Sequence, residues 1–283
     1  MNSALNFALF LSLMGERFAG SRDRGFSMKL EGVDAFLFDV FGTVFDWRTS
    51  VEAELDAIEI KYNLNIQSSD DGWKVDFAQE WRTKFFVTAH AIVAGTPGTS
   101  NMDELNRQIL DRMLDTPGSR WGFLSNLLND AARQELNGVW HRLRAWDDSS
   151  PGLHALKKHC IIATLSNGNV RLLVDLAKQS DLPWDAVFST GLFDTYKPDP
   201  KTYISAARHL SLPTARCAMV AAHAHDLRAA AALGMRTVCI PRPREDLEAD
   251  AMKPKAEGGE VDLVVRSIEE LARIVAEAKS ERG

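Results

Sequence analysis

The sequence predicts an α/β protein with a doubly wound parallel sheet and a helical cap inserted after the first strand. From about residue 33, short apolar runs alternate with helical stretches, which requires crossover connections and a parallel sheet covered on both faces. The segment 47–148 breaks this alternation and shows only helical periodicity. The length of 283 residues suffices for one large domain that carries a smaller insertion.

The first expected strand is the apolar run Ala35–Asp39, which ends in a carboxylate. Five similar runs follow and are typical of buried parallel strands: Cys160–Leu165, Ala186–Ser189, Cys217–Ala221, Thr237–Ile240 and Asp262–Val265. Helices are expected between and after them, at Gly168–Gln179, Lys201–Leu210, Asp226–Leu233 and Ile268–Ala278. The charged stretch Pro241–Glu260, which contains Pro and Gly, is interpreted as a surface loop. In this class the functional site lies at the carboxyl ends of the strands.

The inserted segment is expected to contain helices at Val51–Tyr62, Trp73–Ala94, Met102–Leu114 and Ala131–Arg144, with no strand among them. We therefore expect a core domain made of residues 28–46 and 149–283 and a cap domain made of residues 47–148. A cap in this position would lie over the strand ends and exclude water from the site.

Composition excludes some partners. The formal net charge is −6 and no long basic tract is present, which argues against a nucleic-acid partner. An anionic substrate would have to be captured by local positive charge. Cys160, Cys217 and Cys239 lie in separate apolar runs, as is typical of buried thiols in a reducing compartment.

Residues 1–27 are expected to form a poorly ordered N-terminal extension. Their apolar run Ala4–Met14 is too short to span a bilayer and no Lys or Arg precedes it, unlike a secretory signal. Met28 would be a natural start immediately before the first strand. We expect a cytoplasmic protein with no membrane partner.

The segment Phe38-Asp-Val-Phe-Gly-Thr-Val-Phe-Asp46 is the first candidate for chemistry. It places Asp39 at the end of a strand, before a Gly-Thr turn, where its oxygens would be free at the rim. A carboxylate held dry and close to an electrophilic carbon is a competent nucleophile. Taken alone, the segment is equally consistent with an Asp that caps a turn.

Three further segments follow it in order: Thr164-Leu-Ser-Asn-Gly168, Tyr196-Lys-Pro-Asp-Pro200 and Val220-Ala-Ala-His-Ala-His-Asp226. Together the four resemble the motifs of the haloacid dehalogenase superfamily, over about residues 33–280. Each motif is weak by itself, but four in the correct order and spacing are specific. The resemblance implies a hydrolase whose nucleophile is Asp39.

Two departures from the superfamily's phosphatases favour one branch. Those enzymes place a second Asp two residues after the nucleophile, and they hold magnesium with acidic residues of the fourth motif. Here Phe41 and Ala222 stand at these places, so oxygen donors that magnesium prefers are missing. The pattern resembles type II 2-haloacid dehalogenases, in which an aromatic residue follows the nucleophile by two. We expect no metal and no cofactor.

By this resemblance, Asp39 attacks the carbon that bears the halogen of a small anionic 2-halo acid and expels the halide. Water then hydrolyses the resulting aspartyl ester to give a 2-hydroxy acid. Lys197 would orient and stabilise the Asp39 carboxylate. Thr43, Ser166 and Asn167 would place its oxygens, and Ser166 and Asn167 would also hold the substrate. Val40, Phe41, Arg82 and Tyr203 are further expected substrate contacts, and Asp226 is an expected catalytic residue.

Some of these residues also fit a plainer interpretation. Arg82 could be a solvated residue on an amphipathic helix, although the family carries a substrate-gripping Arg in its cap. Tyr203 could simply pack a helix against the sheet. Trp47, Trp73 and Phe85 are interpreted as cap or interface core rather than substrate contacts.

His223 and His225 depart from the family, which commonly has Asn and an aromatic residue at these places. An imidazole beside Asp226 could orient or deprotonate the hydrolytic water. The alternative is that His223 only fills the place of the Asn and holds its loop.

Two other functions stay open from sequence: a phosphatase of the same fold, and a non-catalytic member that binds a small acid. The resemblance also suggests that the chain could form a homodimer, but the sequence shows no interface.

Overall fold

The computed structural model describes residues 30–63 and 72–280 of the chain. The predicted extension at residues 1–27 lies outside the described residues. Six strands form one sheet in the order β5-β4-β1-β6-β7-β8, and every neighbouring pair is parallel. The strands are β1 (Ala35–Phe38), β4 (Ile161–Ser166), β5 (Ala186–Ser189), β6 (Cys217–Ala221), β7 (Arg236–Cys239) and β8 (Leu263–Val264). The predicted α/β class with a parallel sheet is confirmed.

Helices cover both faces of the sheet because residues on β1 alternate between two apolar clusters. Phe36 and Phe38 belong to the cluster that includes side chains of α7 (Ser149–Leu156), α8 (Val170–Gln179) and α12 (Ile268–Ser280). Ala35 and Leu37 belong to the cluster on the other face, with α9 (Pro200–His209) and α10 (Ala224–Ala232). This period of two, with both sets buried, is why the strand appears in the sequence as a continuous apolar run.

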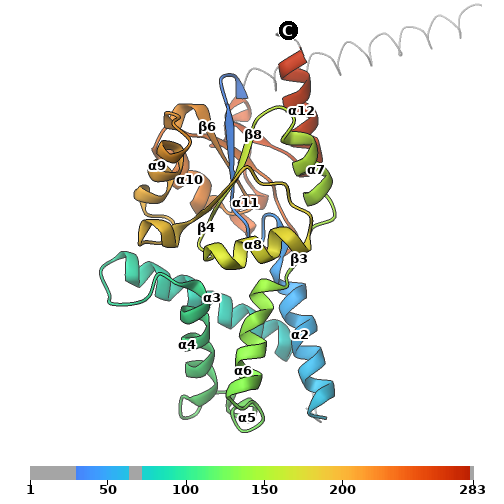
Figure 1. Ribbon diagram of the computed structural model, residues 1–283, viewed down its shortest axis with the longest axis vertical. Helices are drawn as coiled ribbons and strands as arrows, with labels where there is room; N and C mark the ends of the chain where they lie inside the picture. The colour runs from blue at the N-terminus through green and yellow to red at the C-terminus, as the bar shows by residue number, and fades with distance from the viewer. Residues whose placement is uncertain (1–29, 64–71, 281–283) are drawn as a thin grey trace, which may run out of the picture.

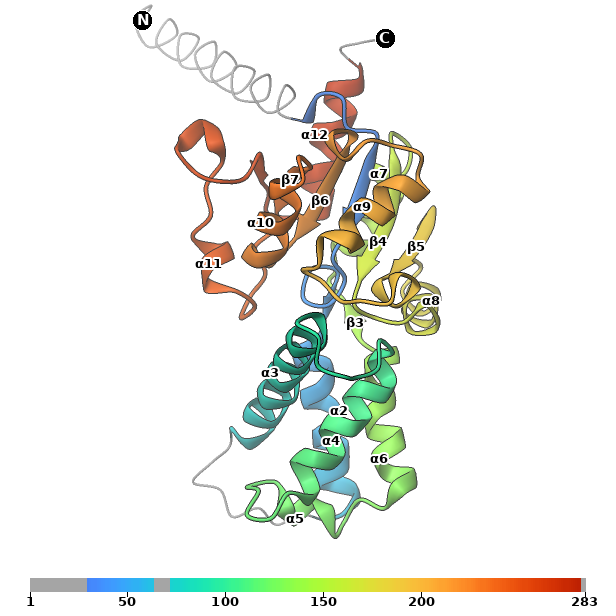
Figure 2. The same cartoon turned by 90° about the vertical axis from the view of Figure 1, so that its left-hand side faces the viewer.

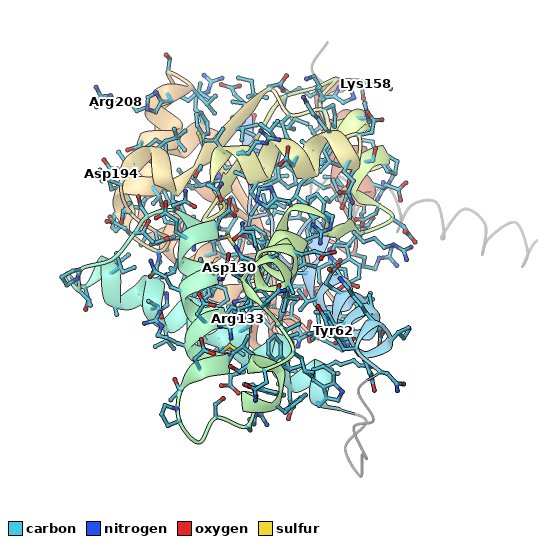
Figure 3. The ribbon with its side chains drawn as sticks, turned by 60° about the horizontal axis from the view of Figure 1, so that its bottom comes forward. Tyr62, Asp130, Arg133, Lys158, Asp194 and Arg208 are labelled. Carbon is cyan, nitrogen blue, oxygen red and sulfur yellow. The ribbon has the colours of Figure 1, made fainter. Side chains whose placement is uncertain are left out.

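The inserted segment forms a helical cap, by which we mean α2 (Trp47–Lys61), α3 (Trp73–Val93), α4 (Met102–Asp115), α5 (Gly122–Ser125) and α6 (Asp130–Asn137). These helices lie below the sheet in the view of Figure 1 and remain on that side of it in Figure 2. In Figure 3, where this side comes forward, Asp130 and Arg133 mark the cap and Lys158 and Arg208 mark the core. Cap side chains join the same apolar cluster as one face of the sheet, so cap and core share a continuous interior.

Two expectations for the cap are wrong in detail. The helix predicted at Ala131–Arg144 ends at Asn137, and a 3-10 helix, Gly138–His141, follows it, consistent with the low helix propensity of glycine. A strand is also present where none was expected. Phe45–Asp46 (β2) pairs antiparallel with Arg144–Ala145 (β3), because the two passages of the chain between core and cap run side by side. The proposed domain boundaries, at 46/47 and 148/149, lie next to this ladder.

The segment expected to be a surface loop, Pro241–Glu260, is partly buried and contains the short helix α11 (Leu247–Asp250). Arg242 is buried, donates to the Thr43 carbonyl oxygen at 3.0 Å and pairs with Asp148. The loop follows β7, so it starts at the edge of the sheet where the other strands also end.

The described part of the chain contains no helix with the length and apolar character required to span a bilayer. The three cysteines are free; Cys217 and Cys239 are buried, whereas Cys160 is partly exposed.

Candidate active site

Asp39 follows the last residue of β1, and its backbone N–H donates to the Val220 carbonyl oxygen of β6 at 3.0 Å. The chain then turns at Gly42, whose φ of +88° is a conformation that glycine adopts without strain. This turn brings Thr43 back toward the carboxylate. Asp39 is only 6% exposed, so it is buried beneath the rim rather than open upon it.

Both oxygens of Asp39 have donors, contrary to the expectation that they are free. Lys197 Nζ lies 2.8 Å from Oδ1. Oδ2 accepts from the Thr43 hydroxyl at 2.8 Å and lies 3.0 Å from His223 Nδ1. The hydroxyl of Thr43 also accepts the N–H of Ala222 at 2.8 Å, which ties the turn after β1 to the loop after β6. The carboxylate is therefore fixed in one orientation.

The electrostatic surroundings keep Asp39 ionised. Burial by itself raises the pKa of Asp39, but the charges and hydrogen bonds of Lys197 and His223 outweigh it and hold the pKa well below its ordinary value. Burial opposes the charge of Lys197 too, yet the carboxylates of Asp226 and Asp39 raise its pKa. Asp39 is thus an anion, and Lys197 a cation, at neutral pH.

Lys197 also contacts Asp226, the first acidic residue of α10. The other oxygen of Asp226 accepts the Tyr203 hydroxyl. Asp226 and Tyr203 are almost completely buried. Tyr203 therefore lies behind Asp226, which supports the packing interpretation of this side chain more than direct contact with a substrate.

Ser166 ends β4 and Asn167 follows it, but neither hydrogen-bonds Asp39, contrary to the expectation that they place its oxygens. The Ser166 hydroxyl accepts the N–H of Gly168 at 3.1 Å. The side-chain oxygen of Asn167 accepts the backbone N–H of Lys197 at 2.8 Å and the Thr190 hydroxyl at 3.2 Å. Asn167 thereby holds the Lys197 backbone, and its amide nitrogen is the end left to donate to a ligand.

His223 contacts Asp39, not Asp226 as the sequence suggested. Its second ring nitrogen, Nε2, lies 3.4 Å from Glu245 Oε2. Burial alone lowers the pKa of His223, but hydrogen bonds and charges from Asp39 and Glu245 raise it to about 9. The imidazole is therefore a cation at neutral pH, with one N–H directed to each carboxylate.

Arg82, on α3, is only 5% exposed and lies in a cage of aromatic rings rather than on a solvated face. Its guanidinium carbon is 4.3 Å from the Phe86 ring centre and 5.2 Å from that of Phe41. Trp47 and Phe85 complete the cage at 5.6 Å each. No hydrogen bond of this guanidinium is found among the described residues, so its N–H groups are open to an incoming anion.

A cavity of about 390 Å³ opens between cap and core next to these groups. Arg82, Trp47 and Phe86 line it from the cap side, and His223 and Glu245 from the core side. Val40 and Phe41 are buried, with Phe41 under the Arg82 guanidinium and edge-on to Trp140. Trp73 and Phe85 are also buried, as expected for interior residues of the cap.

Glu245 is the main residue that sequence reasoning missed. It lies in the stretch interpreted as a surface loop, and it carries no motif. The one signal that could have found it is position, since it follows a strand whose carboxyl end faces the site.

Comparison with known proteins agrees with this arrangement. The family model of haloacid dehalogenase-like hydrolases matches residues 33–234. The chain belongs to this family. The structure of the L-2-haloacid dehalogenase PA0810 is 36% identical, with a TM-score of 0.71 and coverage of 85% of this chain and 98% of that one. The structure of the defluorinating L-2-haloacid dehalogenase Rha0230 is 34% identical, with a TM-score of 0.75 and coverage of 86% and 95%.

A curated relative, the (S)-2-haloacid dehalogenase of Pseudomonas fluorescens, is 25% identical over 130 residues. That match covers 45% of this chain and 57% of the relative, so the chain aligns with little more than half of that protein's length.

The phosphatases of this family bind magnesium beside the nucleophilic Asp. The residues at the same place in this chain decide whether it could bind the ion too. Magnesium requires several free oxygen ligands. The oxygens of Asp39 and Asp226 all accept from protein donors, and the Lys197 ammonium contacts both carboxylates. Within residues 30–63 and 72–280, no three His, Cys, Asp or Glu side chains are grouped as metal ligands. These residues do not fit a magnesium ion.

Proposed function

We propose that the chain hydrolyses the carbon–halogen bond of short 2-halo carboxylic acids and releases a halide and a 2-hydroxy acid. The observation that carries the proposal is the ionised, buried carboxylate of Asp39, held by Lys197 at 2.8 Å beside a cavity under the cap. The relatives named above are L-2-haloacid or (S)-2-haloacid dehalogenases, so we propose the L enantiomers as substrates.

In the proposed first step, an oxygen of Asp39 attacks the carbon that bears the halogen. The electron pair of the carbon–halogen bond leaves with the halide, so no proton is needed and Phe41 can stand where a phosphatase has its acid. Arg82 would bind the anionic substrate and the departing halide, because a guanidinium donates several N–H groups in a rigid fork. The product of this step is a neutral ester on Asp39.

Lys197 and Thr43 would act as orienting groups in this step. They fix the carboxylate in place before the substrate arrives, which lowers the entropic cost of reaching the reactive geometry. Ser166 and Asn167 are proposed to donate to the substrate, as the resemblance implied. The cytoplasmic location and a homodimer also remain predictions.

The test is a paired assay of halide and phosphate release. L- and D-2-chloropropionate, chloroacetate and fluoroacetate would be supplied in one set, and a general phosphate monoester in the other. We expect halide release from L-2-chloropropionate and from at least one of the two acetates, chloroacetate and fluoroacetate. Phosphate release without halide release would favour the phosphatase alternative, and neither activity would favour a non-catalytic binding protein.

A further inference from the structure

Glu245 is the carboxylate near the site that the proposed function leaves without a role. Its side chain is 3% exposed, and Oε2 is within 3.4 Å of His223 Nε2. The same oxygen accepts the indole N–H of Trp47 at 3.0 Å, which links the loop after β7 to the first cap helix. Oε1 is buried without a partner among the described residues. Burial of a carboxylate oxygen without a hydrogen-bond partner is unfavourable, which points to a role for Glu245 at the site.

We propose that His223 is the base that activates water for hydrolysis of the Asp39 ester and that Glu245 is the positioning residue that holds His223 in the reactive tautomer. This inference rests on the proposed function. It assigns the second chemical step, hydrolysis of the ester, to His223, which contacts Asp39, and to Glu245, which contacts His223.

The tautomer follows from the geometry. Nδ1 of His223 faces Asp39, and Nε2 faces Glu245. A neutral imidazole carries one N–H, and it keeps that proton on the nitrogen whose partner is a hydrogen-bond acceptor. Once Asp39 is esterified, Glu245 is the remaining carboxylate in contact with the ring. The N–H therefore stays on Nε2, and the lone pair of Nδ1 faces the ester.

Asp226 is the other candidate base, but both of its oxygens already accept hydrogen bonds from protein groups. Asp226 is held by Lys197 and by the Tyr203 hydroxyl, one on each oxygen, and it is 1% exposed. A proton taken from water by Asp226 would weaken its contacts with the Lys197 ammonium and the Tyr203 hydroxyl, and its side chain does not line the cavity. His223, in contrast, lines the cavity, where water can reach it.

Several charged groups surround His223. Asp39 and Glu245 contact it directly, and Asp246 on the same loop lines the cavity beside it. The His225 ring centre lies 5.6 Å away, and burial lowers the pKa of His225, so that ring is neutral. Lys197 lies on the far side of the Asp39 carboxylate. Alkylation of Asp39 removes one of the two carboxylates that hold the proton on His223, and so promotes its loss.

The protons balance over the cycle. After the halide leaves, the His223 imidazolium loses its Nδ1 proton to solvent, and this is the proton released with each halide. Neutral His223 then takes a proton from water while the water oxygen attacks Cγ of Asp39. The tetrahedral intermediate breaks its bond to the substrate oxygen, which accepts a proton from His223. The Asp39 carboxylic acid returns a proton to His223, and the starting ion pair is restored.

Gly42 leaves the space that this arrangement needs. A Cβ at residue 42 would collide with Glu245 Oε2 and approach His223 Cε1 to 3.0 Å. The backbone at the turn after Asp39 is thus in close contact with both residues, which fixes them relative to the nucleophile.

The test follows the two steps separately in the full chain with L-2-chloropropionate, by rapid quench for halide and intact mass for the adduct. We expect Glu245→Gln to release a burst of about one halide per site, at a rate within about threefold of wild type. Its ester should then decay about 10- to 100-fold more slowly, as when the partner that orients a reactive imidazole is lost. His223→Asn should slow ester decay about a hundred- to ten-thousand-fold.

Two matched controls separate this role from general damage to the loops. Glu248→Gln removes the same charge three residues further on, at a 67% exposed side chain, and should leave ester decay unchanged. His209→Asn changes an imidazole at the end of α9, away from the cavity, and should also leave it unchanged. Near-normal turnover of His223→Asn without an adduct would show that His223 only holds its loop, and normal ester decay in Glu245→Gln would overturn the role of Glu245.

A wild-type measurement covers the case in which Glu245→Gln does not fold. The decay rate of the wild-type adduct should rise with pH through a pKa below the value of about 9 held in the free protein. A decay rate independent of pH between 5 and 9 would overturn the base assignment. Absence of halide release from wild type would instead refute the proposed function, so the two failures are distinguishable.

Discussion

Replacement of Arg82 by methionine would show separately how its buried charge affects the free energy of unfolding and how it contributes to catalysis. Burial lowers the pKa of Arg82 from the ordinary value of a guanidinium to about 10, although the charges of Asp39 and Glu245 oppose the change. At about 1.4 kcal/mol for each pH unit, the fold disfavours this cation by roughly 3 kcal/mol. The aromatic cage offsets part of this cost, since a cation–π contact contributes about 0.5 to 2 kcal/mol.

We therefore expect Arg82→Met to unfold with a free energy equal to that of wild type or up to roughly 3 kcal/mol higher. The value of kcat/KM for L-2-chloropropionate should fall about a hundred- to ten-thousand-fold. This range corresponds to two lost charge-assisted hydrogen bonds of about 1.5 to 3 kcal/mol each. Urea unfolding and halide release, measured on the same preparation, test both expectations.

Arg82→Lys keeps the charge but loses the planar fork, so its kcat/KM should also be severely reduced. Two results would refute this reasoning. If Arg82→Met is destabilised by more than about 2 kcal/mol, Arg82 holds the cap together. If neither variant loses activity, Arg82 does not bind the substrate.

Three other predictions follow from the site. Asp39→Asn should abolish halide release yet give a cooperative thermal transition, because the amide is nearly isosteric but a very poor nucleophile; retained turnover, with reversion to Asp excluded by mass spectrometry, would remove Asp39 from the mechanism. EDTA should leave halide release unchanged and added magnesium should not raise it, since the oxygens of Asp39 and Asp226 are taken by protein donors; a magnesium requirement would contradict this. The raised pKa of His223 should stabilise the fold fully below pH 6.5, and this contribution of roughly 3 kcal/mol should disappear as the pH rises through about 9. The difference in unfolding free energy between wild type and His223→Asn, measured from pH 6 to 10, should therefore shrink, and a constant difference would show that His223 is neutral in the folded protein.

The sheet could be predicted from the sequence because its strands are buried on both faces. Ala35–Phe38 and Cys217–Ala221 contain no polar residue, so each appears as an uninterrupted apolar run. The two-residue strands β2 and β3 could not be predicted, because such a short ladder depends on where cap and core meet and not on local pattern.

The site was predictable where a residue lies in a motif beside the end of an element, as Asp39 does after β1, Asn167 after β4 and Lys197 before α9. The residues that contact them were harder to predict from the sequence. Ser166 was expected to contact the nucleophile, but its hydroxyl instead accepts the N–H of Gly168 in its own turn. Glu245 reaches His223 only because the loop after β7 folds back over the strand ends, a tertiary contact with no signature in the charged stretch around it.

The central claim is that Asp39 itself becomes esterified, and a single turnover in water labelled with oxygen-18 tests it most directly. With enzyme in excess over L-2-chloropropionate, water should attack Cγ of Asp39, so the peptide that contains Asp39 should gain one labelled oxygen. The 2-hydroxy acid should contain none. Label in the hydroxy acid and none in Asp39 would show that water attacks the substrate directly, and would contradict the ester mechanism.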